Sequence, residues 1–185
     1  DISPRSPLDA VKKGMAYITE SRRDNGFFPN FSIAQNMAIS RSLKDGGYKG
    51  AMGLFHEVDE QRTAENQREL LALKCHSVNQ NITELSGGNQ QKVLISKWLC
   101  CRPEVIIFDE PTRGIDVGAK AEIYKVMRQL ADDGKVILMV SSELPEIITV
   151  CDRIAVFCEG RLTQILTNRD DMSEEEIMAW ALPQE

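Results

Sequence analysis

The sequence predicts an α/β fold, in which two stretches of alternating strands and helices are separated by a predominantly helical one. Short apolar runs alternate with helix-length segments in residues 1–30 and 85–185, a pattern typical of βαβ units around a mainly parallel sheet. Residues 31–84 show helical periodicity instead. One apolar run, Val105 to Phe108, ends directly in Asp109 and Glu110, as expected where a buried strand leaves the sheet.

Residues 1–30 contain one short helix and one strand. The helix is expected over Pro7 to Lys13 and the strand over Met15 to Thr19. A polar run, Glu20 to Asn25, follows the strand.

Two helices and a loop are expected in residues 31–84. Ser32 and Gln35 have the spacing of a capping box and mark the start of the first helix. The glycine-rich cluster Asp45 to Gly53 breaks this helix and is predicted to be a loop. A second helix, Glu57 to Leu73, is charged over most of its surface, so that surface is expected to be solvated.

Residues 85–185 return to alternation. Gly134 is placed to end a helix, Glu159-Gly160 to form a hairpin turn, and Ser173 with Glu176 to cap a last helix carrying Ile177, Trp180 and Ala181. The expected elements are helix Gln90 to Cys101, strand Val105 to Phe108, helix Ala119 to Asp132, strand Val136 to Ser141, and a hairpin of Arg153 to Cys158 and Arg161 to Leu166.

Composition limits the function classes. The chain of 185 residues suits one domain, and its formal net charge of -6 argues against nucleic-acid binding, which needs a basic face. It has no apolar run of about 18 residues that could span a membrane, and no signal peptide is visible in its polar, proline-rich start. The five cysteines lie in apolar runs without CxxC spacing, so we expect free thiols in a reducing cytoplasm.

The carboxylates after Phe108 are candidates for nucleotide chemistry. A carboxylate such as Asp109, at the carboxyl end of a strand in an open sheet, suits Mg2+, which prefers hard oxygen ligands. A second carboxylate, Glu110, can orient an attacking water.

The segment Leu85 to Lys92, LSGGNQQK, supplies a complementary anion site. Ser86 is a favourable N-cap residue, and Gly87 and Gly88 let backbone amides approach a ligand. Helix amides and the positive end of the helix dipole attract phosphate. A Ser-Gly-Gly turn alone caps many helices without a ligand, but this octamer stands shortly before a strand ending in Asp-Glu-Pro-Thr.

Together these segments resemble the second nucleotide-binding cassette of bacterial ABC importer ATPases of the monosaccharide type, the ribose, galactose and arabinose group; an autoinducer importer subfamily shares the pattern. The resemblance covers nearly the whole chain. LSGGNQQK resembles the signature motif of the group, VIIFDEPT (Val105 to Thr112) its Walker B segment, and TRGIDVGAK (Thr112 to Lys120) its D-loop region. The stretches GMAYITESRRDNGFF (Gly14 to Phe28) and VSSELPEI (Val140 to Ile147) also resemble the group.

The resemblance implies a P-loop NTPase-like cassette core with an inserted helical subdomain. Residues 1–30 would be the start of the ATPase core up to the Q-loop, 31–84 the helical subdomain, and 85–185 the part with the signature, Walker B, D-loop and switch regions. The P-loop pattern G-x-x-x-x-G-K-[ST], which cradles nucleotide phosphates, does not occur in the sequence. We therefore expect an incomplete cassette that is inactive alone.

The resemblance also implies roles for individual residues. Asp109 would hold Mg2+ through water, and Glu110 would orient the hydrolytic water. Ser86, Gly87, Gly88 and Asn89 would act in trans on ATP held by an opposite cassette. Asp116 matches the D-loop aspartate that bridges two cassettes, although as an N-cap of the next helix it could equally be structural.

Two positions depart from the family pattern. The switch position, normally a histidine, is Ser142, which carries no positive charge. The Q-loop position is Glu20 rather than glutamine, and a carboxylate cannot donate a hydrogen bond. The departures imply one competent and one degenerate ATP site in the assembled protein.

The expected function is ATP hydrolysis that energises import of a monosaccharide or related small solute. ATP and Mg2+ would be the cofactors. The partners would be a second cassette, fused or dimeric, transmembrane permease subunits and, indirectly, a periplasmic solute-binding protein, at the cytoplasmic face of the bacterial inner membrane. Two alternatives stay open, a non-enzymatic remnant or regulatory fragment and a non-transport ABC ATPase.

Overall fold

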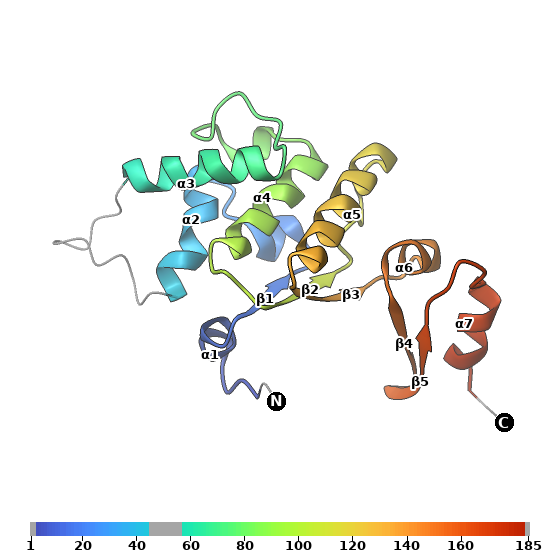
Figure 1. The fold of residues 1–185 in the computed structure, drawn as a ribbon. Helices are drawn as coiled ribbons and strands as arrows, with labels where there is room; N and C mark the ends of the chain where they lie inside the picture. Colours follow the sequence, from blue (N-terminus) through green and yellow to red (C-terminus); the bar gives the residue numbers. More distant parts are fainter. Residues whose placement is uncertain (1–2, 45–56, 184–185) are drawn as a thin grey trace. The chain divides into compact units, whose positions relative to one another are not determined.

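The computed structural model describes residues 3–44 and 57–183, which form two compact units, Asp1–Val140 and Ser141–Glu185. The loop predicted over Asp45 to Gly53 lies outside the described residues. In the described part, the strands of the first unit are β1 (Met15–Ile18), β2 (Val105–Asp109) and β3 (Val136–Val140) (Figure 1). All three run parallel in the order β1-β2-β3, which confirms the predicted parallel sheet.

Two helices cover one face of this sheet. They are α4 (Gly87–Leu99), which packs against β1, and α5 (Val117–Asp132), which packs against β3. The strand residues Ile18, Ile106 and Phe108 are buried beneath them. Of the positions predicted to point inward from α5, Ile123, Met127 and Leu130 are buried and Val126 is half-buried.

The ends of both helices follow local capping chemistry. The Asp116 carboxylate accepts a hydrogen bond from the Ala119 amide at 3.0 Å, so α5 begins at Val117, two residues before the predicted start. Gly134, with φ of +85°, ends α5 as predicted. The α4 helix begins at Gly87 rather than Gln90, since both glycines of the Ser-Gly-Gly turn adopt helical geometry.

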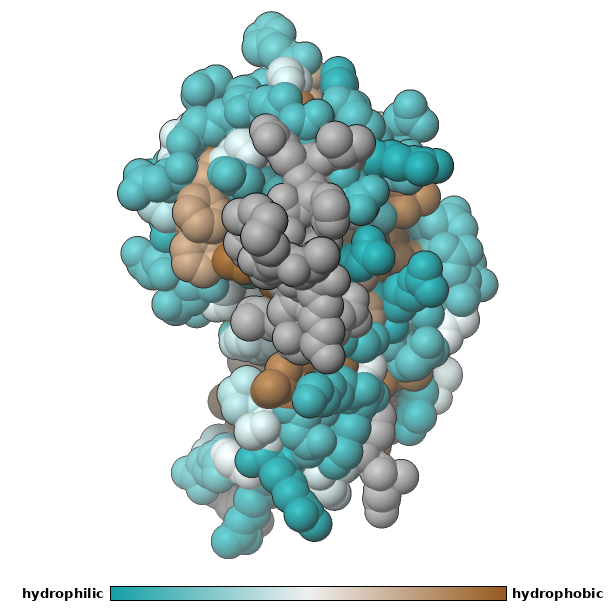
Figure 2. Space-filling view, turned by 90° about the vertical axis from the view of Figure 1, so that its left-hand side faces the viewer, coloured by the Kyte–Doolittle hydropathy of each residue, from teal (hydrophilic) through white to brown (hydrophobic). Residues whose placement is uncertain are grey.

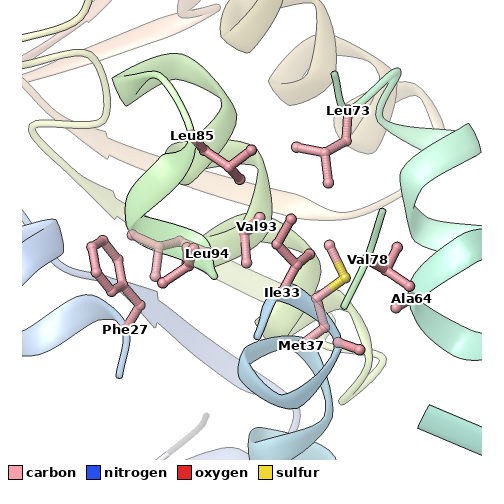
Figure 3. Packing of buried hydrophobic residues seen from close by; sticks show 11 residues of the cluster. Phe27, Ile33, Met37, Ala64, Leu73, Val78, Leu85, Val93 and Leu94 are labelled. Atoms are coloured by element: carbon pink, nitrogen blue, oxygen red, sulfur yellow. The ribbon is translucent and has the colours of Figure 1, made fainter. Parts of the chain in front are cut away.

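The helical part of the first unit contains α2 (Ile33–Lys44), α3 (Glu57–Leu70) and the 3-10 turn η2 (Ile82–Glu84). The predicted capping box is present: the Ser32 amide donates to Gln35 Oε1 at 2.9 Å, and the Gln35 amide donates to Ser32 Oγ at 3.2 Å. These helices share a core with α4 (Figure 3). Its buried members are Phe27, Ile33, Ala34, Met37, Ala64, Leu73, Val78, Ile82, Leu85, Val93 and Leu94.

The α3 helix ends three residues before the predicted end at Leu73. Ala72 has a φ of +46°, which takes the chain out of the helix. Leu71 and Leu73 are both buried, and the Lys74 amide donates to the Asn89 side chain at 2.9 Å. Burial of leucines two positions apart is incompatible with one helical face, so tertiary packing sets the end of the helix.

The start of the chain contains α1 (Pro7–Lys12), as predicted, and a π-helical turn η1 (Arg22–Gly26) within the polar run after β1. This turn was not predicted from the sequence. Ser21 Oγ accepts a hydrogen bond from the Asp24 amide at 3.4 Å at its start. All five cysteines are free thiols, and Cys101 is buried.

The second unit contains α6 (Leu144–Val150), β4 (Arg153–Cys158), β5 (Arg161–Thr167) and α7 (Glu174–Ala181). The strands β4 and β5 form the predicted antiparallel hairpin, with positive φ at both Glu159 and Gly160. The Ser173 hydroxyl accepts from the Glu176 amide at 3.3 Å, as predicted for the last helix. The core of this unit is formed by Ile154, Val156, Met172 and Ile177.

Figure 2 shows a largely hydrophilic side of the molecule, on which hydrophobic residues reach the surface in small separate groups. None of the helices in the described residues has both the length and the apolar character that crossing a membrane requires.

We predict that Leu73→Ala lowers the free energy of unfolding by about 2–4 kcal/mol, because it leaves a cavity in the shared helical core. Leu73 is 5% exposed. Urea denaturation followed by circular dichroism measures the loss. Leu70→Ala is the matched control, since Leu70 is 65% exposed and its loss stays below about 0.5 kcal/mol. Equal losses in the two variants would contradict the packing described for this end of α3.

Candidate functional site

Asp109 and Glu110 lie at the carboxyl edge of the parallel sheet, as predicted. Asp109 is the last residue of β2, and Glu110, with φ of +47°, turns the chain away from the strand. Both side chains are half-buried. A non-glycine residue with positive φ is unusual and frequently marks a functional turn.

A tyrosine that the sequence analysis did not single out holds Asp109. The Tyr17 hydroxyl donates to Asp109 Oδ2 at 2.5 Å, and this bond raises the pKa of Tyr17. Tyr17 pairs in register with Ile107, so it lies on the same face of the sheet as Asp109. The sequence did contain a signal for Tyr17, which stands between the apolar residues Ala16 and Ile18 of a predicted strand. Side chains alternate along a strand, so Tyr17 lies on the face opposite to these two buried residues.

Glu20 forms an ion pair with Arg113, in the turn after Thr112. The segment after β1 therefore contacts the segment after β2, although the two are about ninety residues apart in the sequence. Both side chains are exposed, so the pair contributes little to stability.

The start of α4 differs from its expected capping. Ser86 occupies the N-cap position, but its hydroxyl makes no capping hydrogen bond to a helix amide. Instead Ser86 Oγ accepts from Asn89 Nδ2 at 2.9 Å. Ser86 is therefore the N-cap residue of α4, as predicted, but its hydroxyl bonds to the Asn89 side chain rather than to a helix amide.

Gly88 allows the starts of α4 and α5 to meet. A Cβ at this position would lie 2.5 Å from the Ala119 Cβ, well inside van der Waals contact. A Cβ at Gly87 would meet Arg22 Nη2 at 3.5 Å, an ordinary contact. Packing therefore requires glycine at position 88 and not at 87.

Asp116 lies beside this contact as the N-cap of α5, so its predicted structural role is confirmed. Its side chain is exposed. The bridging role implied by the resemblance stays a prediction.

An ion pair joins α4 to α5 further along, with its lysine buried and its glutamate partly exposed. Lys92 Nζ donates to Glu122 Oε2 at 2.8 Å and to the Ala72 carbonyl oxygen at 3.0 Å. The Lys92 side chain is almost fully buried, and its bond to Glu122, together with Lys74, lowers the pKa of Glu122. Lys92 is the last residue of the octamer LSGGNQQK, and its position there did not indicate this pairing.

The first unit thus brings together Glu20, Ser86 to Asn89, and the turn that leads to Asp116, and it places Asp109 and Glu110 at its sheet edge. Ser142 belongs to the second unit, in the exposed segment before α6. Next to it, Ser141 Oγ accepts from the Glu143 amide at 3.0 Å and donates to Glu146 at 2.9 Å.

Comparison with known proteins identifies the family. Residues 2–113 match the family model for the ABC transporter. The chain is 46% identical over 178 residues to the ribose import ATP-binding protein RbsA of Bacillus cereus, covering 95% of this chain and 35% of that protein. It is also 46% identical over 172 residues to the L-arabinose transport ATP-binding protein AraG of Geobacillus stearothermophilus, covering 91% of this chain and 32% of that protein.

Solved structures show the same fold. The MJ1267 ATP-binding cassette of an ABC transporter aligns with 97% of this chain and 72% of its own, with a TM-score of 0.77 at 18% identity. The dimeric cassette MJ0796, bound to ADP and Pi in a post-hydrolysis state, aligns with 85% of this chain and 64% of its own, with a TM-score of 0.69 at 21% identity.

This chain belongs to the ABC transporter family. Its α/β fold with a parallel sheet is that of the ATP-binding cassettes of the family. The chain spans about a third of the length of the curated relatives it matches.

We predict that Gly88→Ala lowers the free energy of unfolding by about 1–3 kcal/mol, because its methyl group forces α4 and α5 apart. The control is Gly87→Ala, whose methyl group meets Arg22 at an ordinary distance. Chemical denaturation of the two variants provides the comparison. The close approach of the helices would be disproved by a Gly88→Ala protein as stable as the Gly87→Ala protein.

We predict a pH-dependent effect of Glu122→Gln. The folded pKa of Glu122 is lowered, so its pair with Lys92 stabilises the fold above the unfolded carboxyl pKa, about 4.3, and this stability is lost as pH falls through the folded pKa. The variant should melt below the unmodified chain at pH 7, and the difference should shrink as the pH is lowered toward 3.

Thermal melting across this pH range measures the difference. The matched control is Glu104→Gln, whose pair with Lys135 is more exposed and should change melting little at any pH. A Glu122→Gln deficit that stays constant with pH would contradict the assignment.

Proposed function

We propose that this chain is part of the ATP-hydrolysing subunit of an importer for a monosaccharide or a related small solute. The observation that carries the proposal is the placement of Asp109 and Glu110 at the edge of a parallel sheet, in a chain that also presents the Ser86 to Asn89 turn at a helix start. The high identity to ribose and arabinose import ATP-binding proteins supports the choice of solute class.

Asp109 fits a role in binding Mg2+ beside ATP. It offers a hard oxygen ligand at the sheet edge, and the Tyr17 hydroxyl fixes the orientation of the carboxylate. Mg2+, when bound, would neutralise charge on the ATP phosphates. Glu110, the next residue, would orient the water that attacks the γ-phosphate, and the phosphoanhydride bond to the β-phosphate then breaks.

The start of α4 would act on ATP held by the P-loop of an opposite cassette. The Ser86 hydroxyl and the first amides of α4, at Gly87 to Asn89, would stabilise charge on the γ-phosphate. Two observations support this role: the side chain of Ser86 is exposed, and its hydroxyl makes no capping bond within its own helix.

The remaining site residues would make the two ATP sites of the assembled protein unequal. Asp116 would bridge to the opposite cassette while it caps α5. Glu20 would stand at the Q-loop position, where its pair with Arg113 satisfies a carboxylate that cannot donate a hydrogen bond. Ser142, at the switch position, would sense the γ-phosphate only weakly.

The partners follow from the proposed role. They would be a second cassette with a P-loop, and transmembrane permease subunits that contact residues 31–84, the helical subdomain. A periplasmic solute-binding protein would deliver the solute. The subunit would then work at the cytoplasmic face of the bacterial inner membrane. Residues 1–30 would be the start of its ATPase core, 31–84 its helical subdomain, and 85–185 the part with the signature, Walker B, D-loop and switch regions.

We predict that Ser86→Ala and Glu110→Gln have unequal effects on ATP turnover by the full-length ATPase, in which both cassettes have a P-loop. Ser86 would serve the competent site, so its loss should lower turnover about 10-fold or more. Glu110 would serve the degenerate site, so Glu110→Gln should remove at most about half of the turnover. Phosphate release measures both. Near-complete loss in Glu110→Gln would contradict the unequal sites.

We predict that the chain alone binds ATP weakly, because its sequence has no G-x-x-x-x-G-K-[ST] pattern to cradle phosphates. A fluorescent ATP analogue titrated against the purified chain, with and without Mg2+, checks this. Tight, Mg2+-dependent binding at micromolar concentration would show that the phosphates are held elsewhere in the chain.

A further inference from the structure

Arg22, at the start of η1, contacts the turn after Thr112 through both ends of its guanidinium. Nη1 donates to the Arg113 carbonyl oxygen at 3.0 Å, and Nη2 lies 3.4 Å from the Gly114 carbonyl oxygen. The side chain is partly buried, and this burial, followed by the neighbouring charge of Arg23, lowers its pKa. An arginine pKa starts so high that the guanidinium stays charged near neutral pH.

The same Nη2 lies against the start of α4. A Cβ built on Gly87 would be 3.5 Å from Arg22 Nη2 and 3.6 Å from the Gly114 carbonyl oxygen. One planar group therefore fills the space between the start of α4 and the turn that leads to Asp116. Gly114, with φ of +67°, shapes this turn so that its carbonyl oxygen faces the guanidinium.

A second contact runs between the same two segments in the opposite direction. The side chain of Arg113 pairs with Glu20, two residues before Arg22. The segment after β1 thus contacts the turn twice. Its Arg22 donates to the backbone of the turn, and its Glu20 pairs with the side chain of Arg113 in the turn. Because a guanidinium is a rigid, planar donor of several hydrogen bonds, it fixes orientation as well as distance.

We propose that Arg22 is a positioning residue. It holds the start of α4 and the turn at residues 113–116 in a fixed arrangement against the segment after β1, which contains Glu20. This inference rests on the proposed function for its consequence: Ser86 and Asp116 would meet an opposite cassette together, with a fixed spacing. Arg22 itself would not touch ATP, and it acts through the backbone of the two segments.

The effect of removing Arg22 should be local. The two carbonyl oxygens that it binds lie in an exposed turn, where water can replace the lost bonds, so the whole fold keeps most of its stability. The amides of the turn and of the first turn of α4 should open more often. These amides include Ile115, which donates to Thr112, and Gln90, which donates to Ser86.

Hydrogen exchange of the whole chain, followed by mass spectrometry, tests the proposal. In Arg22→Gln, exchange in peptides covering residues 86–90 and 113–116 should be about 10-fold faster, with the remaining peptides unchanged. Arg22→Lys, which keeps the charge but has a single donor nitrogen, should restore part of the protection in the turn. The matched control is Arg23→Gln, since Arg23 is the exposed neighbour and its loss should leave both peptides unchanged.

Two results would overturn the proposal. One is exchange in Arg22→Gln equal to that in Arg23→Gln, and the other is an increase spread evenly over the first unit, which would mean general destabilisation. The exchange experiment needs no nucleotide, so it is independent of the proposed function. That function would fail separately, if the unmodified chain assembled with a P-loop-bearing cassette released no phosphate from ATP.

Discussion

The start of α4 lies against the start of α5, and this contact is possible because residue 88 has no side chain. The methyl group of Ala119 occupies the space that a Cβ at Gly88 would need. Asp116 caps the start of α5 and ends the turn after β2. The contact therefore brings this turn and the Ser-Gly-Gly turn into one small region. The other interactions of the first unit, those of Arg22 and of Lys92, reinforce an arrangement that this close approach makes possible.

Buried lysines of α4 bond to the segments that pack around this helix. Lys92 pairs with the partly exposed Glu122 of α5, which compensates the charge of the lysine. Further along α4, Lys97 Nζ donates to the Gly26 carbonyl oxygen at 2.5 Å and lies 5.3 Å from the ring of Trp98. Burial lowers the pKa of Lys97 to about 8, because desolvation disfavours its charged form.

Local signals predicted much of the fold. The apolar run before Asp109 predicted a buried strand, and the charges directly after it predicted that Asp109 lies at the edge of the sheet. Both signals are visible in a few consecutive residues. The capping box at Ser32 and the glycine at position 134 likewise placed helix ends within a few residues of the observed ones. The parallel direction of the strands followed from the alternation of strands and helices.

Contacts between distant segments could not be predicted in this way. The bond from Tyr17 to Asp109 depends on the register of two strands some ninety residues apart. The end of α3 depends on the burial of Leu73, and the hydroxyl of Ser86 is taken by Asn89. No spacing along the sequence encodes the contact of Arg22 with the turn at Gly114, because it forms only when the sheet assembles.

The role of the Ser-Gly-Gly turn can be tested by a structure of this chain assembled with a P-loop-bearing cassette and trapped with ATP. We predict that the γ-phosphate of ATP bound to the opposite cassette lies within about 3 Å of Ser86 Oγ and the first amides of α4. A nucleotide whose phosphates lie far from the start of α4 would contradict it, and the Ser-Gly-Gly turn would then serve only the packing of α4 on α5.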